Sequence, residues 1–210
     1  MQDKELDALL ERAKIAELLV GWGYWRDTCN WARLAGCYTS DAQMLTTWFS
    51  GTASDFIEAS QRMAAKGSNL QHYIGTPIIE ISQYRATAAT RIQLMVRAQI
   101  DGLPVDAICY GRFHDRLVKQ NGAWRIQRRV PVYEKDTLCA VHPEDALTLD
   151  ASRLQSFPAH YRFLAYLQSL GGATITPDLP APNSPAEHQL FKEDDAWLSS
   201  SHSPTQEDKS

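Results

Sequence analysis

The chain has 210 residues, of which 44% are hydrophobic and 22% are charged. This ordinary globular mix excludes wholesale disorder, collagen and coiled coil, and one domain with an appendage is the default for this length. The formal charge of −4 is the balance of 21 Lys and Arg against 25 Asp and Glu. A dedicated nucleic-acid binder would usually show a basic face, so we expect no nucleic-acid partner.

The cysteines and the N-terminus indicate where the protein works. The four cysteines form no CxxC pair and match no zinc spacing, so we expect reduced thiols and no metal site. The N-terminal segment is charged throughout, unlike a signal peptide. No apolar stretch approaches the roughly 18 residues that span a bilayer. We therefore expect a soluble, cytoplasmic protein without a membrane partner.

The N-terminal third is predicted to be helical around one strand. Apolar spacing predicts helices over 3–26, 30–37 and 53–66, and alternation predicts a strand over 42–49. Gly21 and Gly23 weaken the last turn of the first helix, each by up to about 1 kcal/mol relative to Ala. This cost indicates close packing of that turn, or close approach of its backbone to something else.

The next part of the chain is typical of an antiparallel meander. Strands are predicted over 69–81, 85–100, 103–119 and 123–133. Asp101-Gly102 and Asn121-Gly122 are two-residue hairpin turns between the last three strands.

The C-terminal part reads as an extension of this domain. We expect an irregular segment over 136–150, a helix over 151–171 that Pro158 starts or kinks, an extended segment over 172–185 and a short helix over 190–198. The predicted organisation is a domain over 1–135, an extension over 136–198 that packs on the domain or on a neighbouring subunit, and a disordered tail over 199–210.

Together these elements predict an α+β fold in which a curved antiparallel sheet wraps over the N-terminal helices. A strongly bent sheet of this kind leaves a deep, mostly apolar pocket.

Asp27 and His72 are the candidate acid–base residues. Asp27 follows the first helix between two tryptophans, which would partly desolvate its carboxylate and make it a better base. The alternative is a cap for the following helix. His72 shares its strand face with apolar residues, and an imidazole there needs a partner or is a satisfied core histidine. If the helix end lies beneath the sheet, the carboxylate would fix the His72 tautomer and make His72 a general base.

Two consecutive arginines on the last strand should point to opposite faces. Arg128 shares alternation with Trp124 and Ile126, so we expect Arg128 in the pocket and Arg129 outside. An inward arginine could hold a carboxylate, an enolate or a leaving group. The alternative is that Arg128 is paired structurally with an internal carboxylate.

Aromatic side chains are candidates for the pocket lining. The tyrosines and tryptophans expected to bind substrate are Tyr24, Tyr73, Tyr110, Trp22 and Trp48, although each is also a plausible core residue. His114 and Asp115 read as surface residues. No HExxH, GxGxxG, GxxxxGK or GxSxG motif occurs, so we expect no cofactor.

The order of these features resembles the SnoaL-like branch of the nuclear-transport-factor-2-like (NTF2-like) superfamily. The resemblance covers about residues 5–135. It rests on the opening helix ELDALLERAKIAELLVGWGYWRD, the short helix with Trp31 and Leu34, the strand NLQHYIGTPIIEI and the meander GRFHDRLVKQNGAWRIQRR. Within the superfamily the pattern is similar to the scytalone dehydratase, bile-acid dehydratase and lindane dehydrochlorinase group, which are cofactor-free lyases with an Asp–His pair in a cone-shaped α+β barrel.

The resemblance implies which residues carry the site. The aspartate and histidine of that group fall on Asp27 and His72, and its last-strand basic residue falls on Arg128 or Arg129. The sequence departs from the group where several members carry Tyr or Lys one turn before the aspartate, because Trp22 or Gly23 stands there.

A second departure concerns the internal carboxylate of some members, which has no match among Gln93, Met95 and Arg97. The substrate-side acid is therefore left open, with Tyr24 as a nearby candidate.

The expected activity is a dehydratase or a related elimination or isomerisation on a medium-sized, largely apolar cyclic molecule. The alternatives are a polyketide-type cyclase or isomerase on the same scaffold, and a non-catalytic ligand-binding or assembly subunit. The resemblance also implies a homo-oligomer, either a dimer or a trimer.

Overall fold

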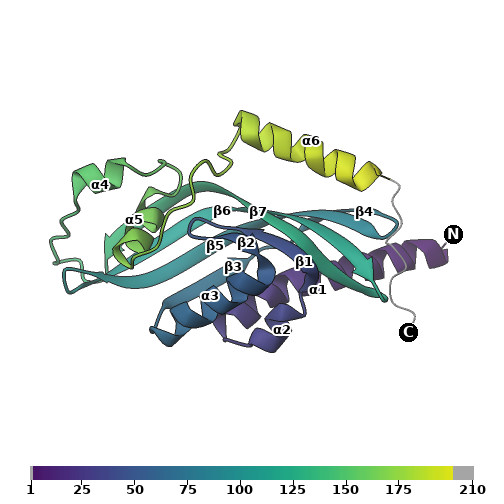
Figure 1. The fold of residues 1–210 in the computed structure, drawn as a ribbon, viewed down its shortest axis with the longest axis horizontal. Coiled ribbons are helices and arrows are strands. Elements are labelled where there is room, and N and C mark those ends of the chain that lie inside the picture. The colour runs from purple at the N-terminus through teal and green to yellow at the C-terminus, as the bar shows by residue number, and fades with distance from the viewer. Residues whose placement is uncertain (1, 201–210) are drawn as a thin grey trace.

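Helices lie at both ends of the described chain and a long sheet lies between them (Figure 1). The computed structural model describes residues 2–200. The helices are α1 (Gln2–Asp27), α2 (Trp31–Ala35), α3 (Ala53–Ala65), α4 (Ala151–Gln155), α5 (Arg162–Leu170) and α6 (Pro185–Ser199). The strands are β1 (Tyr38–Leu45), β2 (Ser50–Thr52), β3 (Asn69–Ile74), β4 (Ile78–Ser82), β5 (Arg85–Ile100), β6 (Leu103–Gln120) and β7 (Ala123–Ala140). Within this part of the chain, no helix is both long and apolar enough to cross a membrane.

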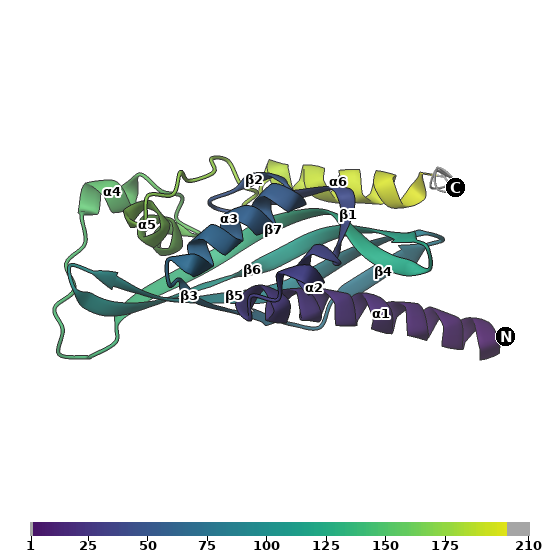
Figure 2. The ribbon, with the colours of Figure 1, turned by 60° about the horizontal axis from the view of Figure 1, so that its bottom comes forward.

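All seven strands form one curved sheet in the order β2-β1-β7-β6-β5-β3, with β4 also paired to β5. The sheet is open, because β2 and β3 at its ends do not pair with each other. Figures 1 and 2 show α1, α2 and α3 on one side of the sheet and α6 on the opposite side. We call these sides the inner face and the outer face. The predicted α+β class with a curved sheet over N-terminal helices is confirmed, with the sheet unclosed.

The two predicted hairpin turns are present. Asp101 and Gly102 have φ angles of 52° and 82°, and Asn121 and Gly122 have φ angles of 50° and 78°. Consecutive positive φ values belong to the turn whose twist matches the flanking strands, which is why an Asp-Gly or Asn-Gly pair occupies it.

Two predicted elements are divided in the structure. The strand expected over 69–81 becomes β3 and β4, which pair with successive parts of β5 on either side of Gly75. The helix expected over 151–171 becomes α4 and α5, with Pro158 in the break, because proline cannot donate the backbone hydrogen bond of a helix interior.

Other boundaries shift by several residues. β1 lies earlier than the strand expected over 42–49, and α6 begins at Pro185 rather than at 190 because Ser184 caps it. β7 continues to Ala140, paired with β6, so the start of the segment expected to be irregular over 136–150 is strand. The strand also runs through the domain boundary predicted at 135. The tail predicted to be disordered begins inside α6 at Ser199, and its residues 201–210 lie outside the described residues.

The main core lies between the sheet and the three N-terminal helices. Ile15, Leu19 and Trp22 of α1 are buried there against inner-face residues such as Phe113 and Leu117. At the other end of the sheet, α5 buries Leu164 in a second cluster on the same face.

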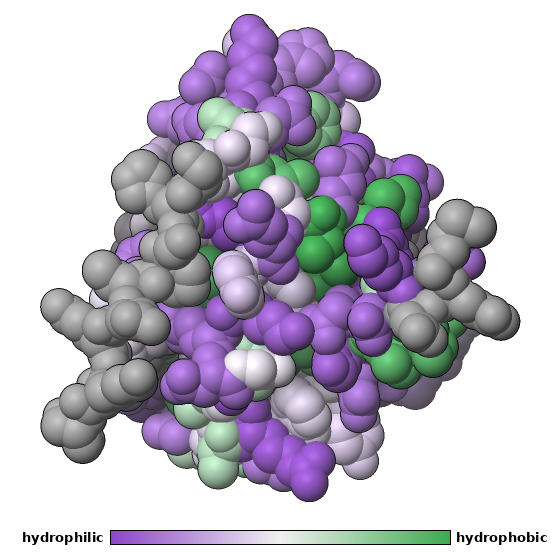
Figure 3. Space-filling view, turned by 90° about the vertical axis from the view of Figure 1, so that its right-hand side faces the viewer, coloured by the Kyte–Doolittle hydropathy of each residue, from purple (hydrophilic) through white to green (hydrophobic). Residues whose placement is uncertain are grey.

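The first half of α1 is different from its second half. The apolar side chains Leu6, Leu9 and Leu10 of its first half are exposed, because this part of the helix projects beyond the sheet (Figure 2). Figure 3 views the end of the molecule toward which α1 points, and shows hydrophobic surface there among hydrophilic residues.

Candidate active site

Asp27 and His72 are in direct contact, as the sequence led us to expect. One Asp27 carboxylate oxygen, Oδ1, lies 2.6 Å from His72 Nδ1, and the other, Oδ2, accepts the backbone N–H of His72 at 2.6 Å. Both side chains are mostly buried. Asn30, rather than Asp27, caps α2, so the Asp27 carboxylate is left to hold the histidine in place. This contact fixes Nδ1 toward the carboxylate and leaves Nε2 as the ring nitrogen that a substrate can meet.

Gly23 explains how the two elements come so close. A Cβ at this position would lie 2.6 Å from Ile74 Cγ1 and 3.4 Å from His72 Cβ. The last turns of α1 therefore lie directly against β3, and only a residue without a side chain allows this approach. The close packing expected from the glycines of this helix is thus present at Gly23.

His72 opens on a cavity of about 710 Å³ between the inner face of the sheet, α1, α3 and α5. Its walls are mostly apolar and aromatic, as ligand sites commonly are. The aromatic lining consists of Trp22, Trp48, Phe56, Phe113 and Tyr133, together with the His72 ring itself. The far wall comes from α5 and the loop after it, so the C-terminal extension completes the cavity.

Among the cavity residues described, Trp22 is the aromatic residue that packs against the His72 ring. Its ring centroid lies 5.3 Å from that of His72 in an edge-to-face arrangement. Its indole N–H donates to the hydroxyl of Tyr38, whose hydroxyl lies 3.3 Å from the Met44 sulfur. Burial raises the pKa of Tyr38. Because its hydroxyl stays protonated, this buried chain holds the Trp22 ring in one orientation against His72.

The last-strand arginines point the opposite way from the sequence prediction. Arg129 is the inward one and is fully buried, with its Nε and Nη2 donating to Asp115 at 2.6 and 2.9 Å. Its guanidinium carbon lies 4.2 Å from the Trp22 ring centroid and 4.3 Å from that of Phe113. Burial opposes the charge of Arg129, but the Asp115 carboxylate holds its pKa above the ordinary value.

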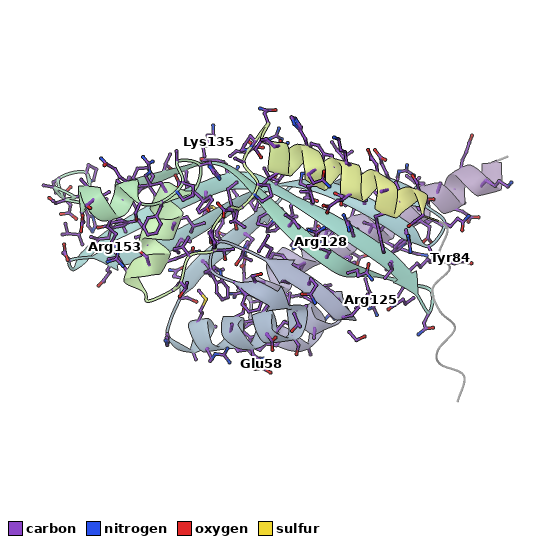
Figure 4. The ribbon with its side chains drawn as sticks, turned by 45° about the horizontal axis from the view of Figure 1, so that its top comes forward. Glu58, Tyr84, Arg125, Arg128, Lys135 and Arg153 are labelled. Atoms are coloured by element: carbon purple, nitrogen blue, oxygen red, sulfur yellow. The ribbon has the colours of Figure 1, made fainter. Side chains whose placement is uncertain are left out.

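Arg128 lies on the outer face and is not in the cavity (Figure 4). Its Nη1 donates to Glu193 of α6 at 3.1 Å. The cause is a β-bulge: Arg128 pairs with Arg116 and Ile126 pairs with Leu117, so Gln127 is an extra residue in β7. One extra residue inverts the alternation of the side chains that follow it, up to a second bulge at Glu134.

The tyrosines expected to bind substrate do not reach the cavity. Tyr24 and Tyr73 are 67% and 60% exposed, and Tyr110 lies under Lys135 Nζ at 5.3 Å without lining the cavity. Of the predicted binding residues, Trp22 and Trp48 line it, and Arg129 reaches it only through the Trp22 and Phe113 rings.

His114 and Asp115 are buried, contrary to the surface positions predicted for them. Asp115 faces inward to Arg129, and His114 is covered by Phe191 of α6 with ring centroids 5.1 Å apart. Asp115 is a buried carboxylate on the inner face of β6, and the signal for it was its even spacing from Phe113 and Leu117 on that face.

Tyr133 and Arg26 are cavity residues that sequence reasoning missed. Tyr133 follows Arg129 by four residues on β7, and burial raises its pKa, so its hydroxyl remains a donor. Arg26 follows Trp22 by one helical turn, a spacing that places both on one side of α1. No cluster of three or more His, Cys, Asp or Glu that could hold a metal is present among residues 4–200, whose side chains are described.

Comparison with known proteins gives the family. The model of the SnoaL-like domain matches residues 7–130. A PEP2-like protein of Fusarium vanettenii is 30% identical over 202 residues, which cover 90% of this chain and 86% of that protein.

Solved structures show the same fold at lower identity. A presumed scytalone dehydratase of Novosphingobium aromaticivorans is 20% identical with a TM-score of 0.55, over 70% of this chain and 100% of its own. The hexachlorocyclohexane dehydrochlorinase LinA-type3 of Novosphingobium barchaimii is 13% identical with a TM-score of 0.56, over 69% of this chain and 99% of its own. From the sequence match and the fold together, the chain belongs to the SnoaL-like family, with the NTF2-like fold.

Proposed function

We propose that the protein is a cofactor-independent lyase that eliminates water, or a comparable leaving group, from a medium-sized and largely apolar cyclic molecule. The observation that carries the proposal is the Asp27–His72 pair, with its 2.6 Å contact, at the wall of a 710 Å³ cavity. A non-catalytic subunit would leave the cavity filled by side chains, so an open cavity beside the pair supports an enzyme. The dehydratase and dehydrochlorinase among the structures of the same fold are consistent with this reaction class.

In the proposed reaction His72 acts as the general base through Nε2. It removes a proton from a carbon next to an electron-withdrawing group, and the electrons of that C–H bond form the new double bond as the leaving group departs. Asp27 holds the imidazole in the required tautomer and stabilises the imidazolium that forms. The apolar lining keeps water away from this charge separation.

The leaving hydroxide needs a proton, and Tyr133 is the residue we propose for it. Among the described residues Tyr133 is the tyrosine that lines the cavity, and its hydroxyl is protonated at neutral pH. The proton passes to the departing oxygen, which leaves as water. The proton that His72 took from carbon then returns to the Tyr133 oxygen through solvent, so that both residues regain their starting forms. Of the two last-strand arginines, the one nearer the cavity is Arg129, and not Arg128 as the sequence led us to expect. Its positive charge lies behind the Trp22 and Phe113 rings.

The test is turnover by variants of the pair. A panel of hydroxylated cyclic compounds is screened by mass spectrometry for loss of water, and the best substrate is then used with His72→Ala and Asp27→Asn. Because a general base typically contributes about 10²–10⁴-fold, we expect a loss of that order in His72→Ala. His188→Ala, at an exposed histidine of α6, is the matched control and should retain full activity. Wild-type rates in His72→Ala would refute the proposed base.

A further inference from the structure

The cavity wall carries positive charge and no negative charge. Four cationic side chains line it, namely Arg26, Arg62, Lys66 and Arg97, and no Asp or Glu does so among the described residues. The chain as a whole has a net charge of −4. The cationic wall is therefore a local property of the cavity.

Arg26 is distinct from the other three because it is deeply buried. It is only 3% exposed, and among the side chains described, those of residues 4–200, its guanidinium has no hydrogen-bond partner and no carboxylate within 4.0 Å. Its neighbour Asp27 forms no hydrogen bond or ion pair with it and holds His72 instead, so the Asp27 carboxylate favours the charge of Arg26 only from a distance. The guanidinium lies 5.6 Å from the Trp31 ring centroid, which is a weaker compensation than an ion pair.

An unpaired buried arginine is unusual. Burying a charge is costly unless it is paired, so buried arginines normally meet a carboxylate. Arg129, on the inner face of the sheet, follows this rule, since Asp115 holds it through two hydrogen bonds. Burial also lowers the pKa of Arg26 below its ordinary value, although a guanidinium remains charged near neutral pH. The protein therefore holds at the cavity wall a desolvated cation that no carboxylate contacts, although the charge of Asp27 favours it from a distance.

The remaining three cationic residues are exposed, and two of them are paired with carboxylates. Arg62 lies 3.7 Å from Glu58 on α3, and Arg97 is hydrogen-bonded to Asp106 on β6. Lys66, just after α3, is exposed. Such groups can attract an anion toward the cavity, but solvent screens them, so they add little to its binding.

We propose that Arg26 binds a carboxylate of the substrate, so that the cavity selects apolar ring compounds that bear one carboxylate over their neutral analogues. A planar guanidinium matches a carboxylate through two parallel hydrogen bonds, and the aromatic walls contact the ring. That the bound carboxylate belongs to a substrate rests on the proposed function, because Arg26 and His72 line the same cavity. The anion site itself requires only the geometry.

The test measures binding and not turnover. Isothermal titration calorimetry compares 2-naphthoate with 2-naphthamide, a neutral molecule of nearly the same shape, on the full chain. We expect wild type to bind naphthoate at least tenfold more tightly, about 1.4 kcal/mol. Arg26→Met should abolish this preference while leaving naphthamide binding unchanged. Arg62→Met, at an exposed arginine of the cavity wall, should preserve the preference for naphthoate.

Two results would overturn the proposal: equal binding of both probes by wild type, or an undiminished preference in Arg26→Met. If circular dichroism shows that Arg26→Met does not fold, Arg26→Lys takes its place. Lysine keeps the charge but lacks the planar fork, so we expect a reduced preference, and a preference equal to that of wild type would refute the role of Arg26.

His72→Ala separates this proposal from the lyase. The variant should keep the naphthoate preference while losing turnover. If it keeps both, the base assignment fails and the anion site stands. If wild type lacks the preference while His72→Ala loses turnover, the anion site fails and the lyase stands.

Discussion

The two faces of the sheet both carry arginines, but they use them differently. On the inner face, Arg129 is fully buried and held by Asp115. On the outer face, α6 lies over Arg112, Arg116 and Arg128 and supplies their carboxylates, namely Glu187, Glu193 and Asp194. The inner pair lies in the protein interior beneath aromatic rings, whereas the Arg128–Glu193 pair is open to water. Residues of one type, adjacent in sequence, thus differ in energetic weight because of the face they occupy.

The largest expected effect comes from breaking the inner pair. Asp115→Ala leaves the Arg129 guanidinium buried without its partner, so we expect the free energy of unfolding to fall by about 3–5 kcal/mol, as measured by urea denaturation. Replacing both residues by Leu and Met should recover much of this loss, because no charge is then left buried. If Asp115→Ala lowered the free energy of unfolding by less than Arg128→Ala on the outer face, the proposed difference between the faces would be wrong.

A second prediction concerns the contact of α1 with the inner-face strand β3. In Gly23→Ala the new Cβ would lie 2.6 Å from Ile74 Cγ1, so the strand that carries His72 must move away from Asp27. A displacement of this kind can reduce turnover by about 10²-fold, and kcat/KM on the substrate found for wild type is the measurement. Gly21→Ala is the control, because its Cβ meets the Trp25 ring, a side chain that can turn aside. Equal activity of the two variants would show that the approach at Gly23 does not position the pair.

On the outer face, buried ion pairs should contribute more to stability than exposed ones. Glu187 is buried and accepts hydrogen bonds from Arg112 and from the backbone N–H of Asn183. Glu187→Ala should therefore cost about 1–3 kcal/mol, because it leaves Arg112 Nη2 and the Asn183 N–H unpaired, although Glu134 still holds Arg112 Nε at 2.9 Å. Arg128→Ala, which breaks the exposed pair with Glu193, should cost about 0–1 kcal/mol. Thermal and urea unfolding measure both, and the reverse order would show that exposure does not set the weight of these pairs.

The smallest expected effect is a pH dependence at the end of the sheet. Hydrogen bonds from Lys119, Lys14 and Trp124 lower the pKa of Glu11 from 4.5 to about 2. Because the folded pKa lies below the unfolded one, Glu11 stabilises the fold fully above pH 4.5 and loses this contribution as the pH falls toward 2. Glu11→Gln should flatten the decline of the melting temperature over that interval, and an unchanged decline would show that Glu11 does not contribute.

Much of the site was predictable because its signals are local. His72 shares the inner face of β3 with Leu70 and Ile74, as strand alternation requires. Asp27 is the last residue of a helix whose periodicity is plain, and the contact between the two follows once that helix lies under the sheet. Their catalytic role stays a prediction.

The rest of the site was not predictable because it depends on pairing between distant segments. The bulge at Gln127 exists only in relation to β6, and it sends Arg128 outward and Arg129 inward. The burial of His114 depends on α6, which begins some seventy residues later in the chain. No alternation pattern within β7 or β6 alone contains this information.

The sequence by itself determined the order of the elements, the two hairpin turns, the α+β class and the residues of the Asp27–His72 pair, since periodicity and turn chemistry act over a few residues. Only the tertiary structure decided which arginine faces inward, that Asp115 is buried beside it, that Leu6, Leu9 and Leu10 project past the sheet, and that Arg26 is buried without a carboxylate in contact with it. The physical reason is that a single inserted residue reverses the faces of a strand, and that burial of a charge depends on every element packed around it.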